Sequence, residues 1–202
     1  MAKPVYFPAH GFVADELPLN FYNELLLDTQ SRADKLSYRD KLAGSLTEEY
    51  LLEVSDGFKN YLASLCHLYD KSFGVPANKA NTSGEYQYNL CSAWVNYQKK
   101  YEYNSAHDHH GDYSFVIWLK IPYDLQEEMN QPHVKGAAFN YASQFCFHYP
   151  AHAGNLAHYP IPVDKTFEGK IILFDARLTH SVNPFFTSDE ERISVAGNLS
   201  RY

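Results

Sequence analysis

Three histidines in this chain have the type and spacing of metal ligands. His107 and His109 are separated by one residue, and His180 follows an apolar run much later in the sequence. Residues i and i+2 of a strand point to the same side, so the imidazoles of His107 and His109 can reach one ion. Imidazole suits iron, zinc or copper, and a set of three protein ligands leaves positions open for a cosubstrate and dioxygen. The pattern therefore predicts a mononuclear metal site with open positions.

An arginine and a serine add a candidate anion site. Arg192 begins a further strand-like run and Ser194 lies two residues later, so both face the same side. The planar guanidinium can hold a carboxylate through two hydrogen bonds, which a lysine cannot do. Taken singly, a histidine is more often a packed residue, and Arg192 would suit a surface ion pair with Glu190 or Glu191. Their order along one chain favours a metal ion with a dicarboxylate anchored beside it.

The first part of the chain, residues 1–85, is expected to be a helical support for this site. Residues 19–28 and 46–62 carry apolar side chains at i, i+3 and i+4, which predicts amphipathic helices. Ser45 and Glu48 have the spacing of a capping box at the start of the second helix.

The second part, residues 86–202, consists of short runs rich in β-branched and aromatic residues, which is typical of strands. Helices followed by several strands predict an α+β, mainly β fold, with the helices packed against an antiparallel sandwich or open barrel. A chain of 202 residues has room for one domain, and we expect a single one. The predicted strands are 86–95, 114–121, 144–149, 170–174 and 192–199.

A long segment among these strands, residues 124–165, is largely polar and contains Gly136 and Gly154. Irregular segments of this length in compact domains are often functional covers. We expect this one to act as a lid, with Tyr and Phe side chains around the mouth of the site.

Composition narrows the possible partners. The net charge of −7 argues against a nucleic-acid backbone as the main partner, because such binding needs a concentrated positive surface. No apolar run approaches the ~20 residues of a membrane span, and the N-terminus lacks the features of a signal peptide. We therefore expect a cytoplasmic protein that binds neither nucleic acid nor membrane. Its three cysteines are predicted to be buried thiols: Cys66, Cys91 and Cys146.

Two blocks of the sequence resemble the 2-oxoglutarate/Fe(II)-dependent dioxygenase superfamily, and in particular its small hydroxylases, many of which occur in phages and marine bacteria. The resemblance covers roughly residues 90–200. The first block carries Trp94, Asn96, Asn104, His107, His109, Gly111, Asp112 and Ser114, and the second carries Gly169 through Phe174, His180, Val182, Pro184, Phe185, Glu191 through Ser194, and Asn198.

The resemblance implies a double-stranded β-helix, a jelly-roll or cupin-like fold, with iron at its open mouth. His107 and His180 would ligate Fe(II), while Arg192 and Ser194 would hold the distal carboxylate of 2-oxoglutarate. Three further residues are expected to line the cosubstrate pocket: Asn96, Tyr97 and Trp118.

The third metal ligand departs from the superfamily's usual His-x-Asp/Glu…His set, because His109 stands where the carboxylate is expected. His109 can ligate together with the other two histidines. Alternatively, only two histidines ligate and His109 lies beside them, which would resemble the aspartyl/asparaginyl β-hydroxylases. A shifted register would instead use His110 and Asp112. We prefer His107 with His109, and Asp112 is the reserve ligand.

The function that the resemblance implies is that of a dioxygenase using Fe(II), 2-oxoglutarate and O2. It would couple decarboxylation of 2-oxoglutarate to succinate with hydroxylation of a protein side chain or a small molecule. If the source is a virus, its location would be the host cytoplasm. Two other hypotheses remain: a cupin-like enzyme with a three-histidine metal that does not use 2-oxoglutarate, and a non-enzymatic jelly-roll binding module.

Overall fold

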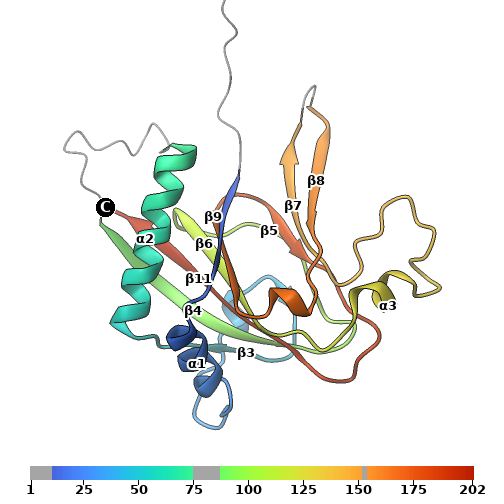
Figure 1. Cartoon of the computed structure of the whole chain (residues 1–202), viewed down its shortest axis with the longest axis horizontal. Helices are drawn as coiled ribbons and strands as arrows, with labels where there is room; N and C mark the ends of the chain where they lie inside the picture. The colour runs from blue at the N-terminus through green and yellow to red at the C-terminus, as the bar shows by residue number, and fades with distance from the viewer. Residues whose placement is uncertain (1–10, 75–86, 152–153) are drawn as a thin grey trace, which may run out of the picture.

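The protein, described here by a computed structural model over residues 11–74, 87–151 and 154–202, contains two antiparallel sheets (Figure 1). The larger sheet has six strands in the order β1-β9-β6-β11-β4-β3, and the smaller has five in the order β2-β5-β10-β7-β8. The strands are β1 (Phe12–Glu16), β2 (Gly44–Ser45), β3 (Glu49–Leu51), β4 (Tyr88–Gln98), β5 (Tyr103–His107), β6 (Tyr113–Lys120), β7 (Phe145–Pro150), β8 (Leu156–Ile161), β9 (Lys170–Asp175), β10 (His180–Val182) and β11 (Arg192–Arg201).

The path of the chain between the sheets is that of a jelly-roll. From β4 onward, β4, β6, β9 and β11 join the larger sheet, while β5, β7, β8 and β10 join the smaller one. Strands that are neighbours in a sheet are therefore often distant in the sequence, as in the pairing of β11 with β4. This architecture confirms the predicted mainly β jelly-roll class.

Two helices, α1 (Leu19–Asp28) and α2 (Asp56–Phe73), cover the outer face of the larger sheet (Figure 1). The first has the predicted bounds. The second buries side chains at helical spacing on one face, including Phe58, Leu62 and Leu65. A short third helix, α3 (Leu125–Met129), and the 3-10 turns η1 (Arg39–Lys41) and η4 (Lys165–Phe167) lie in the connections.

The helix predicted over residues 46–62 is wrong in its first half. Residues Glu49–Leu51 form β3, which pairs with β4, and the helix begins only at Asp56. The cap is Ser55, whose hydroxyl accepts a hydrogen bond from the backbone N–H of Phe58 at 3.2 Å, whereas Ser45 lies in β2. The free edge of β4 offers this segment backbone partners that local periodicity cannot reveal.

Alternation along the strands separates two hydrophobic cores. On β6, Phe115, Ile117 and Leu119 belong to the cluster under the helices, while Val116 and Trp118 belong to the cluster between the sheets. Both faces of this strand are therefore buried, which explains its nearly continuous apolar sequence. The inner cluster encloses the candidate site.

All five predicted strands are present, with ends that differ by a few residues. Two predicted boundaries lie outside the described residues: the start of the first strand at residue 86 and the division of the chain near residue 85. Six further strands, most of them short, were not predicted from the sequence: β1, β2, β3, β5, β8 and β10. Most of these are polar or too short to show a period, and tertiary pairing determines them.

The segment 124–165 is more regular than expected. It contains α3, β7, β8 and the start of η4, and Figure 1 shows the remaining loop after α3 extending away from the sheets. The three cysteines are free thiols: Cys66 and Cys146 are buried as predicted, but Cys91 is exposed. Cys91 lies near the start of β4, outside both core clusters, where its thiol donates to Ser200 Oγ at 3.1 Å.

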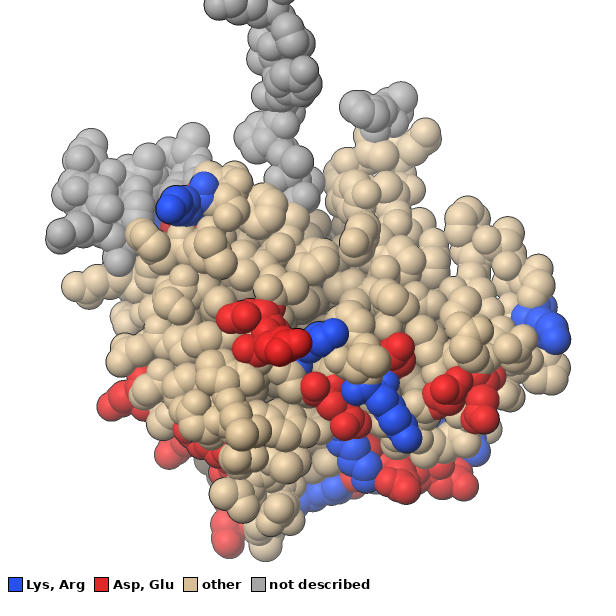
Figure 2. Space-filling view, viewed as in Figure 1, with Lys and Arg blue, Asp and Glu red and all other residues tan. Residues whose placement is uncertain are grey.

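Charged side chains of both signs are interspersed on the face shown in Figure 2, and Lys and Arg form no extended patch there. None of the helices formed by the described residues is long and apolar enough to cross a membrane.

A buried ionic network fastens α2 to the larger sheet. The carboxylate of Asp70 accepts hydrogen bonds from Tyr113 at 2.5 Å, Tyr88 at 2.9 Å and Arg201 at 3.1 Å. The side chains of Arg201 and Asp70 are only 2% and 8% exposed. Opposite charges held in this geometry stabilise each other, and removing one partner of a buried pair is strongly destabilising.

We predict that Asp70→Ala lowers the free energy of unfolding by about 3–5 kcal/mol, because it removes one partner of a buried ion pair together with the acceptor of two tyrosine hydroxyls. Urea denaturation measures the change. The control is Asp189→Ala, which removes a surface partner of Lys100 that is 94% exposed and should cost less than about 1 kcal/mol. Equal losses in the two variants would contradict a structural role for the Asp70 network.

Candidate metal centre

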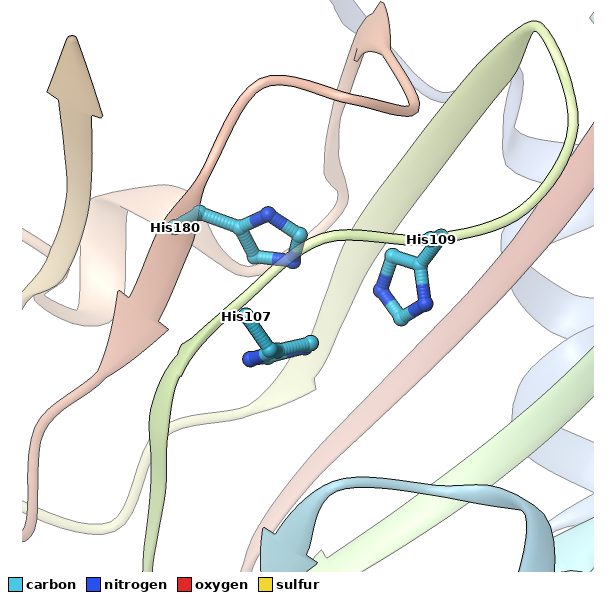
Figure 3. A group of neighbouring side chains, drawn as sticks. All are labelled: His107, His109 and His180. Atoms are coloured by element: carbon cyan, nitrogen blue, oxygen red, sulfur yellow. The ribbon is translucent and has the colours of Figure 1, made fainter.

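The three histidines lie close together, two of them on neighbouring strands of the smaller sheet (Figure 3). His107 is the last residue of β5 and His180 is the first of β10, and the two are direct partners in the pairing of these strands. The ring centroids of His107 and His180 are 4.4 Å apart, and those of His109 lie 4.9 Å and 5.1 Å from them. One nitrogen of each ring lies within 4.8 Å of one nitrogen of the others, which is close enough for a shared ion.

Backbone carbonyls orient two of the imidazoles. The Nδ1 atom of His107 lies 2.6 Å from the carbonyl oxygen of Ser105, and that of His180 lies 2.9 Å from the carbonyl oxygen of Leu178. A carbonyl only accepts, so each Nδ1 donates its proton and Nε2 is left as the position that can bind a metal. This is the arrangement that prepares a histidine for binding a metal through Nε2.

His109 reaches the group from the loop after β5, not from the strand itself. The predicted i, i+2 argument is therefore wrong for this pair, although both rings do point toward one place (Figure 3). The backbone N–H of His109 donates to the carbonyl of Ala176 at 2.8 Å, and its ring packs beside Trp94. These contacts of the loop, and not the alternation of a strand, place the His109 ring beside that of His107.

Burial favours the neutral form of two of these imidazoles, those of His109 and His180. Desolvation, aided by the neighbouring His107, lowers the pKa of His109 to about 4. Desolvation together with His107 and His109 also lowers the pKa of His180 well below its usual value. Neutral imidazole is the form that binds metal, so the donor set fits a divalent transition-metal ion such as Fe(II).

The reserve ligand Asp112 lies elsewhere. Its carboxylate is buried and accepts a hydrogen bond from the backbone N–H of Arg201 at 2.9 Å. Within the described ranges, the group able to share an ion at this position consists of the three histidines and includes no carboxylate. The arrangement supports the register of His107 with His109.

A cavity extends from the histidines between the two sheets. Its walls combine apolar and aromatic side chains with a few polar groups. The residues that line it are Leu42, Ala43, Leu46, Glu49, Trp94, Asn96, Gln98, Asn104, His107, His109, Ser114, Phe115, Val116, Phe145, Phe174, His180, Val182, Ser194 and Ala196.

The expected lid does not contribute to this wall as predicted. From segment 124–165, only Phe145 of β7 lines the cavity among the described residues. Leu42, Ala43 and Leu46, which flank β2, also line the cavity. These residues belong to the region that was predicted to be only a support.

Arg192 lies just behind the cavity wall and is 2% exposed. Its Nε and Nη2 donate to Gln98 Oε1 at 3.1 Å and 2.6 Å, and Gln98 itself lines the cavity. The remaining donors bind Tyr123 Oη at 2.7 Å, the carbonyl of Ser143 at 2.6 Å and the carbonyl of Asn183 at 3.0 Å. All of these acceptors are neutral, so this buried cation has no carboxylate partner among the residues that the structure describes.

The other expected cosubstrate residues divide into two groups. Asn96 and Ser194 line the cavity and are joined by a hydrogen bond of 3.2 Å. Tyr97 faces the opposite side of β4, where its hydroxyl donates to the carbonyl of Thr29, because alternate residues of a strand point to opposite faces. Trp118 lies between the sheets but packs against Phe145 and Phe167, and it is not part of the cavity wall.

Two polar residues of the cavity were missed. Glu49 and Asn104 line it, and the buried side-chain oxygens of both lack a hydrogen-bond partner among the described residues. Glu49 had been assigned to a helix, which would have hidden its position. Burial raises the pKa of its carboxyl to about 7.

A second group of ligand atoms, from Cys146, His148 and His158, lies on β7 and β8. The Nδ1 atoms of the two histidines are 2.7 Å apart, which is the separation of a direct hydrogen bond between the rings. This second group could bind a metal ion of its own, so measurements of metal binding to the whole protein include both groups.

Comparison with known proteins gives one family. The family model described as "Putative 2OG-Fe(II) oxygenase", in which 2OG denotes 2-oxoglutarate, matches residues 92–198, more than half of the chain. A search of curated proteins finds no match.

Solved structures share the fold at low sequence identity. A prolyl-4-hydroxylase from Pseudomonas putida is 15% identical, with 96% of this chain and 94% of that chain covered at a TM-score of 0.54. An oxidoreductase of the 2OG-Fe(II) oxygenase family from Burkholderia pseudomallei is also 15% identical, with coverages of 94% and 85% and a TM-score of 0.53. HygX from Streptomyces hygroscopicus, solved with nickel and 2-oxoglutarate bound, is 12% identical, with coverages of 95% and 83% and a TM-score of 0.55.

We predict that replacing His107, His109 or His180 by Ala lowers the affinity for Co(II), used as a spectroscopic substitute for Fe(II), by more than about tenfold. Equilibrium dialysis with metal analysis measures the affinity, in a His158→Ala parent that disables the second group. His67→Ala, which changes an exposed histidine of α2, is the matched control. If only His109→Ala kept full affinity, the two-histidine arrangement would be correct instead.

We also predict a pH-dependent gain in stability for Glu49→Gln. The ordinary pKa of this carboxyl is 4.5 and the folded value is about 7. Between these values the folded state holds a proton that the unfolded state has lost, so this group makes stability fall as pH rises. The free energy of unfolding of the variant, relative to wild type, should increase by about 2–3 kcal/mol from pH 5 to pH 8.

Urea denaturation at the two pH values measures this increase. The control is Glu53→Gln, which alters an exposed carboxylate two residues beyond β3. A constant difference between Glu49→Gln and wild type at both pH values would mean that Glu49 already has a partner in the folded protein.

Proposed function

This chain belongs to the 2-oxoglutarate/Fe(II)-dependent oxygenase family, and from that premise we propose that it is a hydroxylase whose Fe(II) is held by His107, His109 and His180. It is an enzyme of a family that uses Fe(II), 2-oxoglutarate and O2. The observation that carries the proposal is the convergence of three imidazoles on one end of a cavity. Two of the rings are already oriented through Nδ1 to present Nε2.

The buried guanidinium of Arg192 supports 2-oxoglutarate as the cosubstrate. A cation that is 2% exposed and bonded only to neutral oxygens is stabilised further by an anion. Carboxylate acceptors make shorter and stronger hydrogen bonds to guanidinium than amide or hydroxyl oxygens do. We propose that the distal carboxylate of 2-oxoglutarate displaces part of the Gln98 contact, with Ser194 and Asn96 beside it.

The bound metal would supply the oxidation in which one atom of O2 enters succinate, the other enters the hydroxylated product, and CO2 leaves. The chain supplies binding and orientation. His180 is stacked on Phe145, with ring centroids 5.3 Å apart, and Phe174 packs edge-on against it, so these two rings shield His180 from bulk water. The substrate on this proposal is a protein side chain or a small molecule.

The two other hypotheses have less support. A three-histidine metal enzyme that does not use 2-oxoglutarate gives the buried charge of Arg192 no role. A non-enzymatic jelly-roll module predicts solvated histidines, yet His180 is 4% exposed and the carbonyl of Leu178 orients its ring. Both are also outside the matched family.

We predict that Arg192→Lys raises the Kd for 2-oxoglutarate by about 10- to 100-fold while leaving Fe(II) binding unchanged. A lysine cannot offer the planar pair of donors, although it keeps the charge. Anaerobic titration of the Fe(II)-loaded protein, followed by the visible charge-transfer band of the metal–cosubstrate complex, measures the Kd.

The matched control is Arg177→Lys, which changes an arginine paired with Asp175 near the protein surface. Its titration should match that of wild type. A wild-type protein that binds Fe(II) but gives no saturable band and no succinate would remove 2-oxoglutarate from the proposal and favour the three-histidine enzyme.

A further inference from the structure

The cavity contains one carboxyl group that the proposed chemistry does not use. Glu49 lies on β3, is 1% exposed and lines the cavity together with the three histidines. Neither of its oxygens has a hydrogen-bond partner among the described residues. Buried carboxylates in folded proteins are normally paired or hydrogen-bonded, because burying an uncompensated charge is costly.

Other buried carboxylates of this chain follow that rule. Glu128 is 0% exposed, and it accepts hydrogen bonds from the backbone N–H groups of Phe186 and Thr187, each at 2.8 Å, and from the hydroxyl of Thr187 at 2.5 Å. Asp70 has Arg201 and two tyrosine hydroxyls. Glu49 is therefore the exception within the part of the chain that the structure describes, and its donors must come from outside the chain, from water or from a ligand.

Two amide oxygens beside Glu49 are also unpaired. Asn96 is the direct partner of Glu49 in the pairing of β3 with β4, so both side chains project from the same face of the sheet. The Oδ1 atom of Asn96 has no partner, while its Nδ2 donates to Ser194. Asn104 contributes a further unpaired Oδ1 from β5 in the facing sheet. The cavity thus presents three acceptor groups that lack donors.

The approach to these acceptors is apolar. Leu42, Ala43 and Leu46, which immediately precede β3 in the chain, line the same cavity. Such a wall favours a hydrocarbon chain, and the acceptor groups favour a donor-rich, positively charged end. A primary ammonium has three N–H donors, one for each of the acceptor groups.

We propose that Glu49, Asn96 and Asn104 bind the primary ammonium group of an alkylamine substrate, whose alkyl chain packs on Leu42, Ala43 and Leu46. The inference rests on the proposed function, because it places the substrate in the cavity that holds the metal site. It identifies the substrate class: an aliphatic chain that ends in an amine, such as a lysine side chain or a free diamine. The carbon atoms next to the bound amine then face the histidine end of the cavity.

Charge around Glu49 is consistent with this role. The charged groups that act on its carboxyl are Arg39, which is exposed and favours the ionised form, and Glu102, which opposes ionisation. The cavity also contains the three histidines, two of which have a lowered pKa. Since the pKa of Glu49 is about 7, an ammonium ligand should bind less well as pH falls below that value.

Calorimetric titration of the metal-free full chain with n-pentylammonium at pH 8 tests the proposal directly. 1-Pentanol serves as the neutral ligand of similar size. We expect saturable binding of pentylammonium that is at least about tenfold tighter than that of pentanol. Affinity for pentylammonium should fall about tenfold from pH 8 to pH 6, following the ionised fraction of Glu49.

Glu49→Gln keeps the shape of the side chain and removes the charge, so it should abolish both the preference for ammonium and the pH dependence. Glu53→Gln should preserve both, since that carboxylate is exposed. Thermal unfolding verifies that each variant is folded. Equal binding of pentanol and pentylammonium, no binding of either, or an unchanged preference in Glu49→Gln would each overturn the proposal.

Neither iron nor 2-oxoglutarate is present in this titration, so its outcome is independent of the Arg192→Lys titration, and either proposal can fail alone. A second set of titrations distinguishes the sources of the amine. Tighter binding of Nα-acetyl-lysine methylamide than of a free diamine would indicate a peptide side chain. Tighter binding of a free diamine such as cadaverine than of that peptide analogue would indicate a small molecule.

Discussion

The antiparallel pairing of β5 with β10 is the constraint on which the site depends. It makes His107 and His180 direct neighbours although more than seventy residues of sequence separate them. The short β10 is held on its other side by β7, so the position of His180 is determined by two strands at once. Because the backbone carbonyls of Ser105 and Leu178 also orient the two rings, the same local geometry that forms the sheet prepares the metal-binding nitrogens.

Buried charge distinguishes the residues that support the fold from those that await a ligand. Asp70 with Arg201, and Glu128 with the backbone around Thr187, are satisfied within the protein and fasten elements together. Arg192 has only neutral acceptors, and Glu49 has no partner among the described residues. A buried ion without a counter-ion costs stability, and such a cost is commonly found where a protein binds a ligand of opposite charge. The two residues thus suggest that the cavity binds an anion near Arg192 and a cation near Glu49, with Asn96 common to the two proposed sites.

The N-terminal region has a larger role than a support. Its helices cover the outer face of the larger sheet, but the segment between them also adds β2 and β3 to the two sheets. Leu42, Leu46 and Glu49 from this segment form part of the cavity wall. The strands from β4 onward would provide the metal ligands and the anion site, whereas the segment between α1 and α2 adds apolar side chains and one carboxyl group to the cavity wall. It is therefore a reasonable place for the selectivity of the enzyme to reside.

The sequence by itself determined the chemistry and the class of fold. His107, His109, His180 and Arg192 were selected as candidate site residues from residue type, order and their resemblance to a family, and the apolar runs of β6 and β9 predicted strands. Only the tertiary structure decided which side chains share the cavity. Strand alternation excludes Tyr97 from the cavity wall, and the packing of Trp118 against Phe145 excludes it as well. Glu49, predicted to lie in a helix, lies in a strand because its segment pairs with the edge of β4. The physical reason is that hydrogen bonds between distant strands outweigh weak local propensities, and a single strand's pattern does not reveal its partner.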